Sequence, residues 1–137
     1  LLVIWADDSA AYFVGKAWGR HKCAPAVSPN KTWEGCVGGL VASAIVGMVL
    51  AAASGLFGWI GEALWKGLVF GLVVGVAGQI GDLVESAVKR EIGIKDFGSL
   101  LPGHGGVLDR FDSLILAAPV AYWLLDAWSL IPRFFRP

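Results

Sequence analysis

One uncharged stretch, residues 35–61, constrains the fold of this chain more than any other feature. A helix needs about 20 apolar residues to cross a bilayer, and this stretch exceeds that length. The composition agrees, since 56% of the residues are hydrophobic, only 16% are charged and the mean hydropathy is +0.67. These values are typical of an integral membrane protein.

Apolar segments alternate with two polar ones, which predicts an all-α, polytopic membrane bundle with about four transmembrane helices. We expect a single domain over residues 1–137, with helices at 1–18, 33–59, 63–90 and 109–131. The loops are then 19–32 and 91–108. Because only a short turn near Gly61 separates the second and third helices, they form an antiparallel hairpin. Both loops therefore lie on the same side of the membrane.

Basic residues indicate which side that is, because cytoplasmic loops carry an excess of Lys and Arg. Most of them belong to the loop side: Lys16, Arg20, Lys22, Lys31, Lys89, Arg90, Lys95 and Arg110. We therefore expect the loops to face the cytoplasm, although Arg133 and Arg136 at the other side require snorkelling or a tilted helix. The formal net charge is zero, so bulk electrostatics give no case for nucleic-acid binding.

Small residues recur at every fourth position in the two central helices: Gly39, Ser43 and Gly47, then Gly67, Gly71 and Gly75. Such faces let helices approach closely in lipid, so we interpret them as packing surfaces. The two cysteines, Cys23 and Cys36, form no CxxC motif. His21 beside Cys23 is only a weak zinc signal, and we expect two free thiols in a reducing compartment.

Acidic residues inside apolar segments point to function, because a charge at membrane depth costs several kcal/mol and is usually functional or paired. The third helix carries Asp82, Glu85, Ser86 and Lys89, whose spacing of three, four and seven places them on one stripe. The alternative is a set of pairs within that helix. Asp8 in the first helix either reaches the same site or makes a buried polar contact between helices.

The second loop and the start of the last helix add glycines and charges. Glycines surround His104, and Lys95, Arg110, Asp109 and Asp112 flank them. Glycine-rich backbone can present amides to an anion, basic side chains bind phosphates, and carboxylates hold Mg²⁺. These residues predict a phosphate or metal site at the membrane surface.

Residues 86–112 resemble the signature of the phosphatidate cytidylyltransferase family. Its elements stand here as Ser86, Lys89, Arg90, Lys95, Asp96, Gly98, Pro102, His104, Gly105, Gly106, Asp109, Arg110 and Asp112. Two further stretches resemble the family's first conserved membrane helix and its Ser-Pro-x-Lys-Thr-x-Glu-Gly loop. They contain Trp5, Asp8, Ala11, Tyr12 and Gly15, then Ser28, Pro29, Lys31, Thr32, Glu34 and Gly35.

The resemblance implies an enzyme that joins CTP and phosphatidic acid at the bilayer, giving CDP-diacylglycerol and pyrophosphate. Mg²⁺, alone or with a second cation, is the implied cofactor, and a homodimer is one option for assembly. Family members carry further membrane helices before this region. We therefore expect the chain to be the C-terminal catalytic half of a longer protein.

The resemblance and the chemistry together assign roles to individual residues. Asp82 and Asp109 are the expected metal ligands and, with Lys89, Arg110 and His104, the expected catalytic residues. A hydrogen-bonding or structural role for His104 is favoured over that of a general acid. The expected substrate-binding residues are Ser28, Lys31, Thr32, Ser86, Arg90, Lys95 and Asp112.

Two other functions remain as alternatives. A CTP-dependent polyprenol or phytol kinase shares the nucleotide but transfers phosphate to an alcohol, which needs a base. A membrane transporter or channel would use the acidic residues inside the helices to line an ion path. The basic, glycine-rich loop would then have no purpose.

Overall fold

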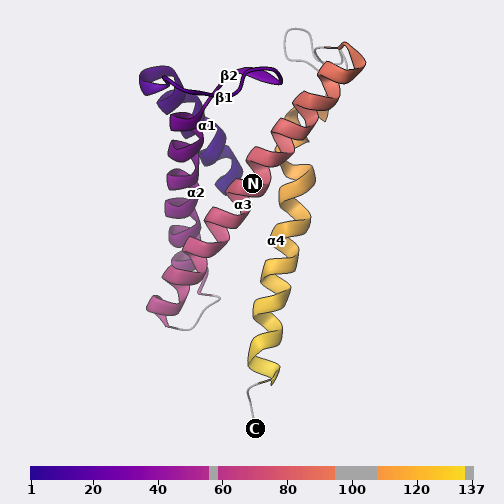
Figure 1. Cartoon of the computed structure of the whole chain (residues 1–137). Helices are drawn as coiled ribbons and strands as arrows, with labels where there is room; N and C mark the ends of the chain where they lie inside the picture. Colours follow the sequence, from indigo (N-terminus) through magenta and orange to yellow (C-terminus); the bar gives the residue numbers. More distant parts are fainter. Residues whose placement is uncertain (56–58, 95–107, 135–137) are drawn as a thin grey trace.

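The computed structural model describes residues 1–55, 59–94 and 108–134, with side chains in the last range for residues 112–128. Its elements are α1 (Leu2–Trp18), β1 (Lys22–Ala24), β2 (Ser28–Thr32), α2 (Trp33–Ser54), α3 (Ile60–Ile92) and α4 (Leu108–Phe134). Helices α2 and α3 pack extensively, α1 packs on α2, and α4 packs on the other flank of α3 (Figure 1). The described part of the chain is helical apart from one short hairpin.

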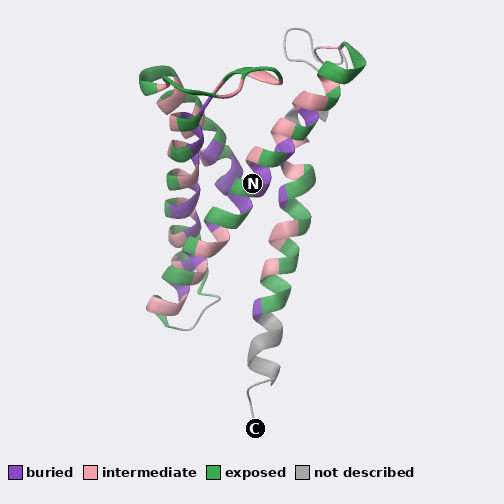
Figure 2. Ribbon diagram, in the orientation of Figure 1, coloured by how far each residue is buried: buried purple, intermediate pink, exposed green. Residues whose placement is uncertain are grey.

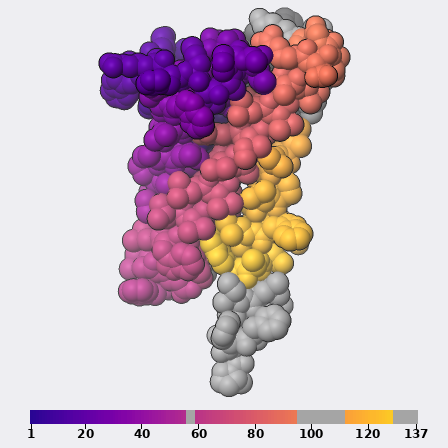
Figure 3. Space-filling view, in the orientation of Figure 1, coloured from indigo at the N-terminus to yellow at the C-terminus, as the bar shows by residue number. Residues whose placement is uncertain are grey.

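That hairpin was not predicted from the sequence. Strands β1 and β2 pair antiparallel, with Lys22 opposite Thr32 and Ala24 opposite Ser28, inside the stretch expected to be a loop. Three and five residues are too few to show the alternation of apolar and polar positions that signals a strand. In Figure 3 α1 and this hairpin, in indigo, form a broad cap over one end of the bundle.

Capping geometry decides where the central helices begin and end. Helix α2 begins after Thr32, whose Oγ1 accepts a hydrogen bond from the Gly35 N–H at 3.2 Å. It ends at Ser54 rather than at the expected position 59, because Gly55 adopts the left-handed conformation with φ 63°. Helix α3 ends at Ile92 in the same way, because Gly93 is left-handed with φ 76°.

The small residues of α2 and α3 face one another, as their spacing predicts. A Cβ added at Gly71 would collide with the backbone of Ser43, and one at Gly67 would lie 2.7 Å from the Cα of Met48. Only residues without a large side chain permit this backbone approach, so glycine is required at both positions. The two helices are therefore held close together where these small residues meet.

A buried apolar core forms where three helices meet. Val3 and Ile4 come from α1, Val74 and Ala77 from α3, and Ala117 from α4. This core fixes the first turn of α1 between α3 and α4. It thereby sets the position of the acidic residues one turn later in α1.

Large apolar side chains cover the outside of the bundle. Along one face of α2, Val37, Val41, Ile45 and Val49 are each more than half exposed. Figure 2 shows that exposed positions run along the outer faces of all four helices. Two of the described helices, α2 and α3, are long and apolar enough to cross a membrane. These features indicate a membrane protein.

Candidate active site at one end of the bundle

A cavity of about 530 Å³ opens where α1, the hairpin, the first turn of α2 and α3 meet. Four of the predicted site residues line it: Ser28, Lys31, Thr32 and Asp82. Two further lysines, Lys16 and Lys22, contribute positive charge to its wall, and the remaining lining residues are Asp8, Ala11, Tyr12, Gly15, Asn30, Gly35 and Cys36. The cavity is thus polar and mixed in charge, although it lies at the end of an apolar bundle.

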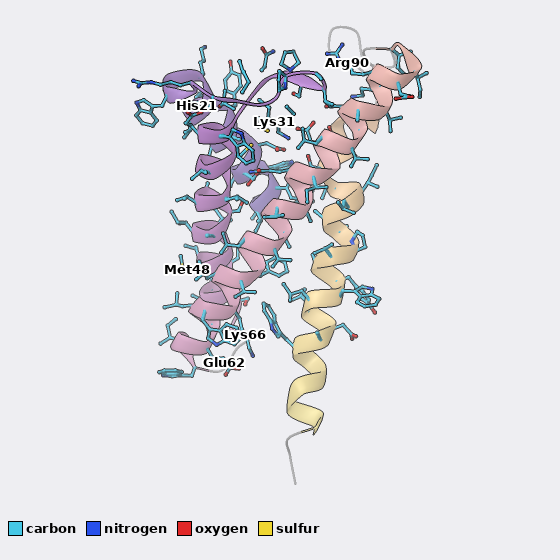
Figure 4. The ribbon with its side chains drawn as sticks, viewed as in Figure 1. His21, Lys31, Met48, Glu62, Lys66 and Arg90 are labelled. Atoms are coloured by element: carbon cyan, nitrogen blue, oxygen red, sulfur yellow. The ribbon has the colours of Figure 1, made fainter. Side chains whose placement is uncertain are left out.

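An ion pair inside this cavity joins two distant segments. The Nζ of Lys31 lies 2.6 Å from Oδ2 of Asp82, and it also donates to the main-chain oxygen of Gln79 at 3.2 Å. The side chains are 15% and 33% exposed, respectively, so the pair is partly withdrawn from solvent. Figure 4 shows Lys31 between the hairpin and α3. An anion entering the cavity would meet a lysine already held in place.

A second contact ties the hairpin to the end of α3. The Nε of Arg90, an expected phosphate contact, donates to the main-chain oxygen of Val27 at 3.3 Å. Arg90 is exposed and lies at the same end of the bundle as Lys31 (Figure 4). The hairpin and the end of α3 therefore lie together, as the antiparallel arrangement of α2 and α3 predicts.

The polar stripe on α3 divides into two parts. Asp82 pairs across elements with Lys31, and Ser86 Oγ lies at the long distance of 3.5 Å from Asp82 Oδ1. Glu85 is buried and pairs with Lys89 at 2.6 Å, one turn later on the same helix. The alternative of pairs within the helix thus describes Glu85 and Lys89 but not Asp82. Lys89 is not among the residues that line the 530 Å³ cavity.

The two neighbouring aspartates of α1 have different environments. Asp8 lines the cavity, together with Ala11, Tyr12 and Gly15 on the same face of the helix. Asp7 is 2% exposed and makes the buried contact between helices that was the alternative for Asp8. Asp8 is not among the site residues predicted above. Its spacing of three, four and seven from Ala11, Tyr12 and Gly15, which resemble the same family helix, is the signal that points to it.

Further carboxylates approach Asp8 from two other helices. Asp82 on α3 and Asp112 on α4 both act on it electrostatically, as does the cation of Lys31. The start of α4 lies close to α3, because a Cβ added at Gly81 would be 3.0 Å from the main-chain oxygen of Asp112. Among the described residues, no three His, Cys, Asp or Glu side chains are close enough together to hold a metal ion.

Several predicted residues have structural contacts or lie outside the description. Thr32 is buried and its hydroxyl oxygen caps α2. The thiols of Cys23 and Cys36 are free, with their Sγ atoms 4.0 Å apart. Lys95 and His104 fall outside the described residues, and so do the side chains of Asp109 and Arg110. The predicted meeting of Asp82 and Asp109 therefore stays a prediction.

Comparison with known proteins decides the family. The sequence profile of the cytidylyltransferase family matches residues 1–128. The chain belongs to the cytidylyltransferase family. All the site residues predicted from the sequence, from Ser28 to Asp112, fall inside the stretch that matches this family.

Individual members of the cytidylyltransferase family are also similar to this chain. It is 48% identical over 128 residues to a phosphatidate cytidylyltransferase of Bacillus subtilis (strain 168), covering 93% of this chain and 46% of that protein. A phosphatidate cytidylyltransferase of Staphylococcus saprophyticus is 48% identical over 124 residues, with 90% and 46% covered. One from Brucella suis is 49% identical over 120 residues, with 88% and 43% covered. The chain spans just under half the length of these relatives.

Proposed function

We propose that this chain carries the active site of a phosphatidate cytidylyltransferase, which transfers CMP from CTP to phosphatidic acid. One observation carries the proposal: a cavity at the end of apolar helices holds an ion pair between Lys31, in a segment that resembles a family motif, and Asp82, four residues before the family signature. Similarity to proteins named phosphatidate cytidylyltransferase supports it. The position beside the apolar helices suits a substrate whose tails stay in lipid.

The reaction needs charge neutralisation more than a base. A phosphate monoester has a second pKa near 6, so phosphatidic acid is already largely a dianion at neutral pH. One of its phosphate oxygens attacks the α-phosphorus of CTP, the bond from that phosphorus to the bridging oxygen breaks, and pyrophosphate leaves. Fixed cations stabilise the charge that gathers on the leaving group. In the cavity Lys31 is the best-held cation, and Lys16 and Lys22 lie on the wall.

Magnesium is part of the proposal. Carboxylate oxygens are the donors that Mg²⁺ prefers, and Asp82 supplies one such group to the cavity. Asp82 would hold the ion together with Asp109, and a second cation would draw on the same carboxylates. When bound, Mg²⁺ supplies a Lewis acid for the phosphate oxygens. Lys31 then keeps Asp82 in place until substrate arrives.

The remaining predicted side chains are assigned to the substrates. Ser28 on the hairpin and Ser86 on α3 would donate to phosphate oxygens, and Arg90, Lys95 and Arg110 would add positive charge. Lys89, held by Glu85 in this structure, would join them after exchanging its partner. Asp112 would orient these cations. Asp8 is added to the site because it lines the cavity.

We further propose that all four helices lie in the membrane, with the cavity facing the cytoplasm, and that the chain is the C-terminal half of its protein. The basic residues around the cavity support this orientation. Four of the exposed tryptophans lie toward the two ends, Trp18 and Trp33 near the hairpin and Trp59 and Trp65 near the opposite end. Tryptophan is enriched at membrane–water interfaces. The headgroup of phosphatidic acid would then reach the cavity at the cytoplasmic interface.

A substrate comparison tests the function. The full-length protein is purified in detergent and given labelled CTP with phosphatidic acid, or with a polyprenol or phytol. We expect labelled CDP-diacylglycerol and pyrophosphate in the first reaction only. A phosphorylated alcohol would instead identify a lipid kinase, and ion flux in liposomes without nucleotide transfer would identify a transporter. Light scattering on the same preparation tests for the homodimer.

A further inference from the structure

A buried polar network lies directly behind the cavity, and none of the functional assignments above uses it. Asp7 on α1 accepts a hydrogen bond from Ser43 Oγ of α2 at 2.8 Å. It also accepts from Gln79 Nε2 of α3, at 3.1 Å to Oδ1 and 3.0 Å to Oδ2. The three residues join three helices, and Asp7 and Ser43 are 2% and 0% exposed.

Gln79 connects this network to the cavity. Its side-chain Nε2 bonds Asp7 and also the main-chain oxygen of Cys36 on α2, at 3.0 Å. Its own main-chain oxygen accepts from the Nζ of Lys31, the same atom that pairs with Asp82. Gln79 and Asp82 are three residues apart on α3, so they share a face of the helix. One residue therefore holds α3 against α1 and α2 through its side chain and holds Lys31 through its backbone.

The helix backbones are shaped to admit this network. A Cβ added at Gly39 would lie 2.9 Å from Gln79 Nε2 and 3.0 Å from Asp7 Oδ1. One at Gly75 would lie 2.8 Å from Ser43 Oγ. The backbone at these two glycines thus lies directly against the three polar side chains. This close packing leaves the side chains little freedom to rearrange.

We propose that Gln79, which is hydrogen-bonded to Asp7 and linked through Asp7 to Ser43, is a positioning residue. It determines where the side chains of Lys31 and Asp82 lie in the cavity. It acts through those two residues and does not touch the substrates. If the side-chain hydrogen bonds of Gln79 are lost, α3 can rotate or slide by a fraction of an ångström against α1 and α2. The ion pair then moves relative to the bound phosphates, and small displacements of this kind are costly in rate. This inference rests on the proposed cytidylyl transfer.

The test uses Gln79→Leu in the full-length protein, which removes every side-chain hydrogen bond but leaves the main-chain oxygen. We expect kcat to fall by about tenfold or more, with the KM for CTP changed by less than about threefold. Trp128→Leu is the control, because Trp128 is buried and packs against Trp65 near the opposite end of the bundle, outside the network. It should lower the melting temperature in detergent by a similar amount without this loss of kcat.

Exchanging the amide of Gln79 and the carboxylate of Asp7 provides a second test. This test also applies if the Gln79→Leu variant does not fold. Gln79→Glu alone sets two carboxylates against each other and should abolish most activity. Adding Asp7→Asn restores one amide opposite one carboxylate and should recover part of the lost kcat.

The results separate the two hypotheses. A wild-type protein that makes no CDP-diacylglycerol would refute the proposed function itself. With an active wild type, normal kcat in Gln79→Leu, an effect on KM alone, or a double variant no better than Gln79→Glu would each overturn the positioning role.

Discussion

The two ends of the bundle differ in whether an ion pair joins segments that are distant in the sequence. At the hairpin end, Lys31 pairs with Asp82, a residue far away in the sequence, inside a cavity. At the opposite end, Lys66 pairs with Glu62, one turn earlier on the same helix (Figure 4). A pair within one helix forms wherever the helix forms, whereas a pair between segments needs the whole fold. The hairpin end is therefore where the fold has brought charge together, and we look for chemistry there.

The largest effect is expected from Lys31→Met in the full-length protein. This change keeps much of the apolar stem, removes the cation that faces the phosphates and leaves Asp82 without its partner. We expect the rate of CDP-diacylglycerol formation to fall by about 10²–10³-fold, as for the loss of one transition-state donor. The assay measures labelled CTP turnover at matched expression. Activity within threefold of the wild type would show that the ion pair is structural only.

A smaller loss is expected from Asp8→Asn, which separates the neighbouring aspartates of α1. Asp8 faces the cavity and is exposed, so the substitution should lower kcat/KM by about tenfold, a loss typical of a contributing charged group. The melting temperature should hardly change. Asp7→Asn serves as the comparison, because Asp7 is buried between helices and its change should also lower the melting temperature. Equal loss of stability in both variants would contradict the distinction.

The smallest effect is expected from Lys66→Met at the opposite end. The pair with Glu62 is of the i,i+4 kind and lies within one helix, at the end away from the cavity. Lys66 is not among the residues that line the cavity, so we expect CTP turnover within about twofold of the wild type. Thermal unfolding and the transfer assay are measured on the same preparation. A loss as large as that of Lys31→Met would mean that both ends contribute to catalysis.

The sequence predicted the helices better than their ends. The uncharged stretch predicted the second helix, and the spacing of small residues predicted the tight packing around Gly71, because hydropathy and spacing are local signals. The sequence was less informative about two other features. It missed the end of α2 at Gly55, although a glycine after a helix often marks such an end. It also missed the hairpin, which is held by pairing between strands too short to show a pattern.

The site was predicted residue by residue but not as an arrangement. Lys31 was predicted from its motif and Asp82 from its position as a charge in an apolar helix, yet their contact depends on how the hairpin lies on α3. Asp7 and Asp8 differ by one position on a helix, and only packing shows which one faces the cavity. Gln79 lies in an apolar helix outside the family signature, so the sequence assigns it no role. Its role depends on contacts with three other elements.

The most direct test of the central claim compares Asp82→Asn with Asp126→Asn in the full-length protein. Both changes keep the size of the side chain and remove one charge, but Asp82 lines the cavity and Asp126 is an exposed residue later on α4, outside the cavity lining. We measure formation of labelled CDP-diacylglycerol from CTP and phosphatidic acid at matched membrane expression. The account predicts a loss of at least about a hundredfold for Asp82→Asn, in part restored by excess Mg²⁺, and near-normal activity for Asp126→Asn. Near-normal activity in Asp82→Asn would contradict it.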